Sequence, residues 1–373
     1  MKATFTAQQK EILALLSAMQ PICNKRTALD VTETIFFHVA HRELTLKATD
    51  LEISLQSTMI IESDITEAVS FLISGKRIFE LVKEMDGDIT FVAHDNVLYL
   101  KSGSIEVSLN IRDAQDFPPF PERIENLMEV QSSFFLQLLN KVAFLIPQNN
   151  ANNSLNGMLF EINAHHVALV ATDGHCLAQV TSDKYSLPEE RKWLLPKKAV
   201  LEIKKLLESQ NEEAGVFIGT CGNQLVFSGK NFNFFTRLIA DQFPQYKPIL
   251  DRDGFVPARI ARDSFLKTLK RASCLLAGQF VATNFTFLPG SVNVSITNKE
   301  VGKLEEQLLL QDYAGVGVES RFYSPYLLNG LQVFPQNNVT FYVKSAIKPI
   351  IFESEENSCC MTYLVMPVSI AQQ

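Results

Sequence analysis

The chain has 373 residues, of which 46% are hydrophobic and 20% are charged. These proportions exclude an intrinsically disordered chain, and the length predicts two or three domains with hydrophobic cores of their own. The formal net charge of −7 disfavours a protein that grips nucleic acid through its whole surface, because such proteins usually carry a basic domain or stripe.

Composition also predicts a cytoplasmic protein. No run of about 18 apolar residues occurs, so no transmembrane helix is expected. The first residues, MKATFTAQQK, do not resemble a signal peptide. Six cysteines are scattered without a CxxC pair, which is typical of reduced, buried thiols. We expect Cys359-Cys360 and Trp193 to be packing residues.

In chain order, the sequence predicts three units built from the same elements. Each unit opens with an amphipathic helix, whose apolar residues recur at i, i+3, i+4 and i+7. Alternating strands follow, then a second helix, then more strands that end in a turn before proline. The opening helices are predicted at 7–19, 132–146 and 262–276, the second helices after Ser74-Gly75, Leu195-Pro196 and Ser324-Pro325, and the closing turns at Phe117-Pro118, Phe243-Pro244 and Met366-Pro367.

Internal repetition supports this division. The segment LTLKATDLEISL, from Leu44 to Leu55, resembles VALVATDGHCLA, from Val167 to Ala178, at an offset of about 123 residues. A third, more diverged copy contains RFYSPYLLNGLQV and closes with TYLVMP. The repeat therefore indicates an α+β fold in which each unit lays two helices on an antiparallel sheet.

The segment Thr172-Asp173-Gly174-His175, followed by Cys176, concentrates reactive side chains. Catalysis or metal binding would need further motifs, and neither a GxSxG nor an HExxH motif is present. The first unit has Thr49-Asp50-Leu51-Glu52 at the equivalent place, so Thr-Asp recurs without histidine. We therefore interpret the segment as a strand-ending turn or as part of a binding surface. His165-His166 is predicted to lie at a hairpin turn and not to bind a metal, because successive side chains of a strand point to opposite faces.

Positive charges recur on the predicted helices of all three units. They form either ordinary solvated helix faces or one segregated basic surface on an acidic protein. The residues concerned are Lys76, Arg77 and Lys83 in the first unit, Lys197, Lys198, Lys204 and Lys205 in the second, and Lys267, Lys270 and Arg271 in the third.

Several segments resemble one known family. LNGMLFE, ATDGHCLA, FTRLIADQFPQYKPIL and the C-terminal YLVMP are similar to segments of the bacterial DNA polymerase III beta subunit, the DNA sliding clamp. The resemblance covers the full length, with the three units in the family's order. It implies three repeated clamp domains, at 1–125, 126–251 and 252–373, and a six-domain ring formed as a head-to-tail dimer, with helices lining the hole.

The resemblance implies a processivity factor without catalytic residues, metal or cofactor. Such a ring encircles double-stranded DNA and tethers the catalytic subunit of the replicative polymerase, the clamp loader and other DNA polymerases or repair proteins. Enclosure also accounts for the acidic composition, because only the inner helices need to be basic. Without the resemblance, the residues alone leave two alternatives: a protein-binding scaffold that does not encircle DNA, and a hydrolase that uses Asp173 and His175.

Site residues follow from the resemblance position by position. A hydrophobic peptide-binding pocket would comprise Leu155, Thr172, Gly174, His175, Cys176, Leu177, Pro244, Ile249, Ala346, Leu364, Val365, Met366, Pro367 and Val368. DNA contact is expected from Arg26, Lys197, Lys198, Lys267, Lys270 and Arg271, and subunit contact from Val107 and Leu109 against Cys274 and Leu275.

Two further features concern these sites. Ile105, Val107, Leu109 and Ile111 alternate along one predicted strand, which suggests an exposed apolar edge open to pairing with another chain.

Some positions depart from the family's pattern in the polar rim of the pocket and in one DNA-facing loop. Cys176, Pro248 and Ser369 stand where relatives often carry arginine, and Asn152-Asn153-Ser154 replaces a more basic and aromatic run.

Overall fold

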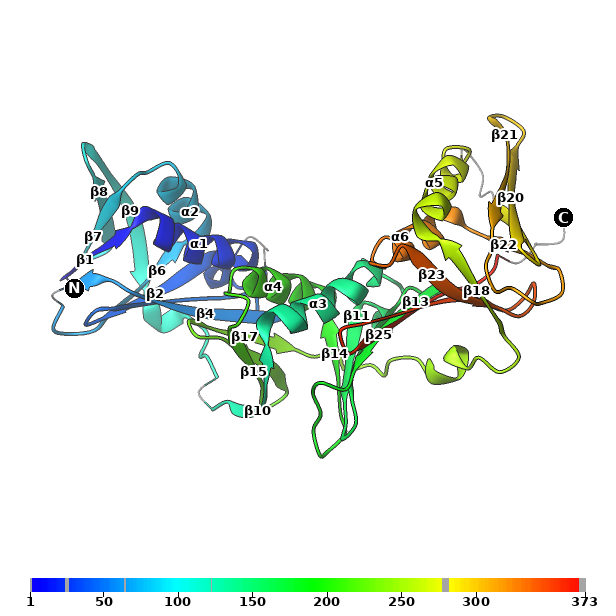
Figure 1. Ribbon diagram of the computed structural model, residues 1–373. Coiled ribbons are helices and arrows are strands. Elements are labelled where there is room, and N and C mark those ends of the chain that lie inside the picture. Colours follow the sequence, from blue (N-terminus) through cyan, green and yellow to red (C-terminus); the bar gives the residue numbers. More distant parts are fainter. Residues whose placement is uncertain (1, 24–26, 64, 122, 277–281, 369–373) are drawn as a thin grey trace. The chain divides into compact units, whose positions relative to one another are not determined.

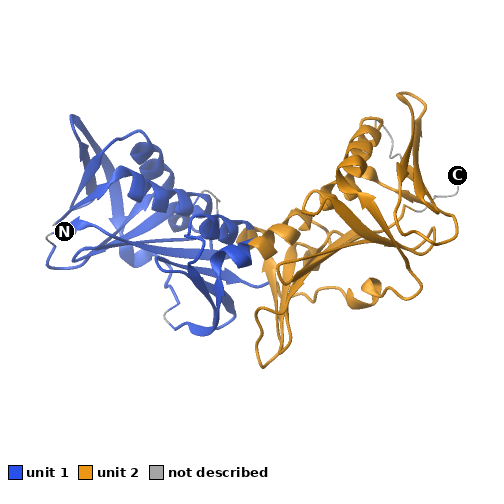
Figure 2. Cartoon of the chain, viewed as in Figure 1, with its two compact units in different colours: residues 1–136, 201–238 blue, residues 137–200, 239–373 orange. Residues whose placement is uncertain are grey.

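The computed structural model describes residues 2–23, 27–63, 65–121, 123–276 and 282–368. Two compact units are present (Figure 2). Unit 1 comprises Met1–Leu136 and Leu201–Leu238, and unit 2 comprises Gln137–Val200 and Ile239–Gln373. The division falls within two helices, α3 (Ser132–Val142) and α4 (Lys197–Glu208). Arg26 and Ser369, singled out in the sequence, lie outside the described residues.

Unit 1 contains a sheet of 13 strands, all paired antiparallel (Figure 1). Helices α1 (Gln9–Cys23) and α2 (Gly75–Lys83) pack against each other and against strands of this sheet, among them β2, β3 and β6. Across the sheet, the strands are β10 (Glu125–Gln131), β15 (Gly215–Cys221), β16 (Gln224–Ser228), β17 (Phe232–Arg237), β4 (Ile53–Ile60), β3 (Glu43–Thr49), β2 (Thr34–Ala40), β6 (Val69–Ser74), β9 (Ile105–Asp113), β8 (Val97–Ser102), β7 (Asp88–His94), β1 (Lys2–Gln8) and β5 (Glu62–Ser63).

Unit 2 contains two antiparallel sheets, and its helices α5 (Arg262–Ser273) and α6 (Ser324–Leu331) pack against each other. The eight-stranded sheet has the order β14 (Arg191–Pro196), β11 (Gly157–Ile162), β12 (Val167–Thr172), β13 (Cys176–Ser182), β25 (Cys359–Val365), β24 (Ile350–Glu356), β23 (Asn338–Val343) and β18 (Val256–Ala261). The four-stranded sheet has the order β21 (Gly302–Leu309), β20 (Ser291–Asn298), β19 (Thr283–Leu288) and β22 (Val318–Phe322).

The helices confirm the predicted periodicity, with shifted ends. The first helix extends to Cys23 because Ile22 and Cys23 are buried and continue its apolar face. The second opening helix ends at Val142, whose φ of −126° is not helical, and a short 3-10 turn follows it. The 3-10 turns are η1 (Asp30–Glu33), η2 (Ala114–Asp116), η3 (Ala143–Leu145), η4 (Asn153–Leu155) and η5 (Lys247–Leu250).

The sequence repeat reappears as a repeated strand junction. In unit 1, β4 pairs with β17, and the amide of Arg237 donates to the carbonyl of Glu52 at 2.9 Å. In unit 2, β13 pairs with β25, and the amide of Met366 donates to the carbonyl of His175 at the same distance, 2.9 Å. Each junction therefore joins one repeat's Thr-Asp turn to the closing strand of the next repeat.

Two further expectations from composition can be compared with the structure. No disulfide joins the six cysteines, all of which lie in the described residues; Trp193 and Cys359 are buried, as expected for packing residues, and Cys360 is half-buried. Trp193 lies edge-on to Phe160, with ring centroids 5.2 Å apart. Within the described ranges, no helix combines the length and apolar character needed to cross a membrane.

Candidate peptide-binding site

The Thr172–Cys176 segment is a closed turn. The hydroxyl of Thr172 donates to the carbonyl of Cys176 at 2.6 Å. The Asp173 carboxylate accepts from the amides of His175 and Cys176, at 2.8 and 2.7 Å. Gly174 lies between them with φ of +92°, a region that favours glycine. Asp173 is thus engaged in fixing the backbone, and the predicted strand-ending turn is confirmed.

The equivalent turn of the first unit has the same bonds. The Thr49 hydroxyl donates to the carbonyl of Ile53 at 3.1 Å, and the Asp50 carboxylate accepts from the amides of Glu52 and Ile53 at 3.0 and 2.8 Å. Because no histidine is present there, these bonds belong to the fold and not to a reaction centre.

The adjacent histidines close a hairpin between β11 and β12. The side-chain oxygen of Asn163 accepts from the backbone amides of His165 and His166, at 2.8 and 3.1 Å. Among the described residues, no group of three or more histidine, cysteine, aspartate or glutamate side chains is arranged to hold a metal ion. The predicted hairpin turn is confirmed.

Strands β13 and β25 form a seam between the Thr172–Leu177 turn and the C-terminal strand, two segments that the family resemblance assigned to one pocket. Cys176 is opposite Val365, and Leu177 is opposite Leu364. The amide bond between Met366 and His175 continues the pairing beyond the last strand residue. The two segments therefore lie side by side, as predicted; that they bind a peptide stays a prediction.

The pleat of the sheet separates the predicted residues into two sets. Leu177 and Leu364 point to one face and join an apolar cluster that includes Leu159, Val170, Leu194, Tyr246 and Ile351. Cys176 and Val365 are buried on the opposite face. Burial, with the nearby charge of Asp173, raises the pKa of the Cys176 thiol to about 12, so this thiol stays protonated at neutral pH.

Exposure divides the predicted pocket into a floor and a rim. The exposed rim includes apolar side chains that a ligand could cover: Met366 is 38% exposed and Ile249 is 45% exposed. The predicted residues are buried at Leu155, Thr172, Cys176, Leu177, Leu364 and Val365, half-buried at Pro367 and Val368, and exposed at Gly174, His175, Pro244, Ile249, Ala346 and Met366. We call the face that carries Leu177, Leu364 and Met366 the seam face.

Two neighbouring residues were missed by the sequence analysis. Tyr326 of α6 stacks on the ring of His175, with centroids 5.6 Å apart and planes inclined by 17°. Ile347, next to the predicted Ala346, is 79% exposed. The aromatic run around Tyr326 was visible in the sequence, but its contact with His175 depends on how α6 packs.

Two polar networks anchor the chain segment that covers the seam face. The phenol of Tyr246 donates to the buried carboxylate of Glu161, which also lies 3.3 Å from the ammonium of Lys192. Burial and this carboxylate raise the pKa of Tyr246, so the phenol keeps its proton. Each buried carboxylate needs such partners, because an isolated charge would be costly to bury.

The second network surrounds Glu353. Its carboxylate accepts from Arg252 at 2.6 Å and from the Tyr342 phenol at 2.8 Å. Burial alone would raise the pKa of Glu353, but the hydrogen bonds from Arg252 and Tyr342 lower it. Together the two networks hold the segment around Tyr246 and Arg252 over the apolar cluster.

The predicted DNA-facing cations lie on α4 and α5. On α4, Lys197, Lys198 and Lys204 are half-buried and surround Leu201, which is 40% exposed, so this helix presents a basic face to solvent. On α5, Lys267 and Lys270 are exposed. Arg271 differs from them, because its guanidinium binds the Glu306 carboxylate of β21.

The predicted subunit edge is present on β9, with one correction. Residues 105–110 pair with β8 on one side, and no strand of the described chain pairs with their other side. Ile105 is exposed, and Val107 and Leu109 are half-buried. Ile111 was wrongly included in the exposed edge: it is buried, because β6 pairs with β9 from this residue onward.

A second open edge, which the sequence analysis missed, lies on β21. This strand ends the four-stranded sheet and pairs along its length only with β20. Cys274 and Leu275, predicted to contact the partner, follow directly after α5, which packs against β21. Cys274 is exposed and Leu275 is half-buried.

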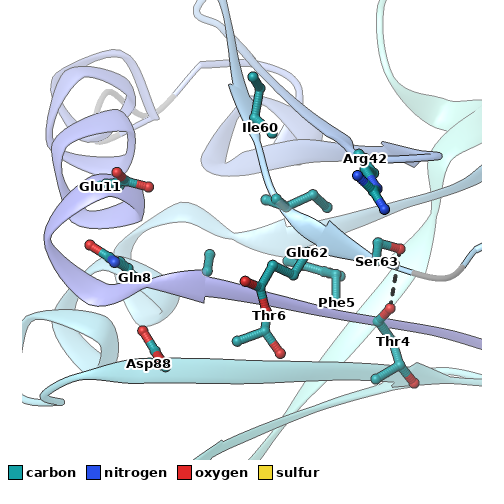
Figure 3. A pocket seen from close by; sticks show the side chains of 12 residues that line it. Thr4, Phe5, Thr6, Gln8, Glu11, Arg42, Ile60, Glu62, Ser63 and Asp88 are labelled. Carbon is teal, nitrogen blue, oxygen red and sulfur yellow. Dashed lines mark hydrogen bonds between the residues drawn. The ribbon is translucent and has the colours of Figure 1, made fainter.

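Unit 1 also contains a hollow of about 750 Å³ between β1, β5 and α1 (Figure 3). Its walls carry the carboxylates of Glu11, Glu62 and Asp88 together with Arg42. Figure 3 shows the hydroxyl of Ser63 directed at the strand opposite it, where it donates to a carbonyl. None of the predicted site residues lines this hollow, so the candidate site is the seam face of unit 2.

Three repeats of two helices on antiparallel sheet, with unpaired strand edges that include β9 in unit 1 and β21 in unit 2, define the class of the DNA sliding clamp. The chain belongs to the DNA polymerase III beta subunit family. The family's N-terminal domain matches residues 3–121, its central domain residues 129–245 and its C-terminal domain residues 249–369. Members of this class are non-catalytic processivity factors that encircle duplex DNA, and the scaffold alternative is not supported.

Relatives match the chain from end to end. The beta sliding clamp of Pseudomonas aeruginosa is 26% identical over 370 residues, covering 98% of this chain and 100% of the relative. That of Haemophilus influenzae is 27% identical over 362 residues, covering 95% and 98%. A Pseudomonas aeruginosa sliding clamp bound to griselimycin superposes with a TM-score of 0.91 at 25% identity, over 99% of this chain and 100% of that one. The clamp of Bacillus subtilis, at 20% identity and a TM-score of 0.92, has the same fold.

Proposed function

We propose that this sliding clamp binds short partner peptides on the seam face and thereby tethers replication proteins to DNA. The observation that carries the proposal is the β13–β25 seam itself. There an apolar floor at Leu177 and Leu364 lies beside exposed apolar side chains, including Met366. A Pseudomonas aeruginosa relative has been crystallised with the ligand griselimycin, so a clamp of this fold can hold a bound molecule.

The seam face suits an apolar side chain at the end of a disordered partner tail. A leucine or phenylalanine could cover Met366 and Ile249 while its backbone meets the turn at Gly174. Burying one such side chain is worth about 1.5–3 kcal/mol. Two such anchors contribute about 3–6 kcal/mol before the cost of ordering the tail, so the side chains alone give a Kd no tighter than about 40 μM. We expect the partners to be the replicative polymerase, the clamp loader and other DNA polymerases or repair proteins.

DNA is held by enclosure, with modest help from basic helix faces. We assign these faces to Lys197 and Lys198 on α4 and to Lys267 and Lys270 on α5. Because the ring surrounds the duplex, few phosphate contacts are needed, and the remaining surface can be acidic. The chain itself is not an enzyme and acts in the cytoplasm.

The ring forms when the β9 edge of one subunit meets the β21 edge of its partner. Each edge has backbone donors and acceptors that no strand of the described chain uses, and β9 adds the apolar side chains of Val107 and Leu109. Three clamp domains per chain, at 1–125, 126–251 and 252–373, then give six domains in a head-to-tail homodimer.

Retention on circular DNA tests the proposal. The clamp is loaded on a closed circle with its loader and then washed with high salt. We expect it to remain bound until the circle is cut, and to bind linear duplex only weakly with a salt-dependent affinity. If cutting the circle leaves the retained fraction unchanged, enclosure is the wrong mechanism.

A further inference from the structure

Arg271 is held by a two-pronged contact within its own subunit. Its Nε donates to one oxygen of the Glu306 carboxylate at 3.1 Å, and its Nη2 contacts the other oxygen at 2.5 Å. The same Nη2 lies 3.3 Å from the hydroxyl of Thr268. This is the bidentate geometry in which arginine binds a carboxylate most strongly.

The carboxylate that Arg271 binds lies on the open edge strand. Along β21, Leu304, Glu306 and Leu308 are more buried than Lys303, Glu305 and Gln307, so Glu306 shares the inner face with the two leucines. Only 25% of its side chain is exposed. Covering this edge with another strand would remove most of the remaining water from that carboxylate.

Arg271 also shares a helix face with the residues expected to meet the partner. Cys274 and Leu275 follow it at i+3 and i+4, the spacing that places side chains next to one another on a helical surface. The carbonyl of Leu275 accepts from the side-chain amide of Asn298, which ties this end of α5 to the β20–β21 hairpin. The guanidinium therefore stands between α5 and the open edge.

We propose that Arg271 is a subunit-interface residue and not a DNA contact. It neutralises Glu306 so that the β9 edge of the partner can cover β21 without burying an unpaired charge. This assignment rests on the proposed pairing of β9 with β21. With its Nε and Nη2 on Glu306, the guanidinium already has its charge compensated within the subunit, so we assign the DNA-facing cations of α5 to Lys267 and Lys270.

At both open edges, other carboxylates are also paired with cations of their own subunit. On β9, Glu106 lies 3.1 Å from Lys101 of the neighbouring strand. On β21, Glu305 lies 2.5 Å from Lys303. The edge carboxylates Glu106, Glu305 and Glu306 are thus each compensated by a cation of the same subunit. The dimer should accordingly depend little on salt, in contrast to an interface held by ion pairs across the subunits.

Sedimentation equilibrium on the full chain tests the proposal. Arg271→Met should raise the dissociation constant of the dimer about tenfold or more, because it leaves Glu306 to be buried without its partner. Lys270→Met, one residue away on the same helix, is the matched control and should leave the constant unchanged. The double variant Arg271→Met/Glu306→Gln removes the stranded charge and should restore it to near the wild-type value.

Salt and a conservative variant complete the test. For the wild type, the constant should change little between about 0.1 and 1 M salt, where the screening length falls from about 10 to 3 Å. Arg271→Lys keeps the charge and should keep the dimer even if Arg271→Met is too unstable to measure.

Two results would overturn the assignment: a dimer of Arg271→Met as tight as the wild type, or a double variant as weak as the single one. A wild-type chain that stays monomeric at micromolar concentration would instead remove the proposed ring.

Discussion

Met366→Ala is the sharpest test of the seam face, and its magnitude follows from exposure. Met366 is 38% exposed in the free chain, so a ligand can cover only that fraction. Full burial of a methionine side chain is worth about 1.5–3 kcal/mol, and the exposed share of it is about 0.6–1.1 kcal/mol. Looser packing around the shortened side chain adds to this, so we expect a loss of about 1 kcal/mol, or about fivefold in Kd.

Isothermal titration calorimetry with a short polymerase-derived peptide measures this loss. The matched control is Ile60→Ala, which shortens another exposed apolar side chain, 83% exposed, on β4 of unit 1. Peptide affinity should be unchanged in the control, and both variants should remain dimeric. An affinity in Met366→Ala equal to that of the wild type, with the peptide still binding, would place the partner site elsewhere.

Three further outcomes are expected. Gly174→Ala should lower the free energy of unfolding in urea by about 1–2 kcal/mol, because a φ of +92° disfavours any residue with a side chain. The added methyl itself has room, since the nearest atom, of Leu155, is 3.9 Å away. An unchanged free energy of unfolding would contradict this prediction. Glu353 has a lowered pKa, so its stabilising effect is present above the unfolded value of about 4.3 and is lost as pH falls through the folded value. The difference in unfolding free energy between the wild type and Arg252→Met should therefore decrease as the pH is lowered into the acid range. A difference that does not change with pH would count against the ion pair between Arg252 and Glu353. Leu109→Asp should give a native mass of one chain, 41.9 kDa, by sedimentation, and a persisting dimer would exclude the β9 edge.

The sequence predicted the elements well because the repeat and the helical periodicity are local signals. The Thr-Asp turn could also be predicted, since its hydrogen bonds join residues that are two to four apart. Its neighbour Cys176 could not be placed from the sequence. Whether it faces the ligand or the helices depends on strand register, and a shift of one residue exchanges the two faces.

The error at Ile111 has the same physical origin, and the contact of Arg271 was equally beyond the reach of local pattern. Ile111 continues the alternation of Ile105 to Leu109, yet β6 covers it, and pairing between strands about 40 residues apart leaves no local signal. Arg271 fits the spacing of Lys267 and Lys270, but it binds Glu306, 35 residues away on another element. Periodicity identifies a helix face; it does not identify what stands opposite that face.

The repeated junction finally bears on how many peptides one chain can hold. Where the unit 2 seam has His175 and Met366, the unit 1 seam has the exposed charges of Glu52 and Arg237. The leucine pair of unit 2 is replaced by Ser54 opposite Phe235, and Phe235 is only 2% exposed.

An apolar anchor in unit 1 would thus gain little buried area and would have to desolvate two charges, which costs free energy without new partners. Calorimetry should give one peptide per chain; a stoichiometry of two would show that the backbone junction alone, and not the seam's apolar side chains, creates the site.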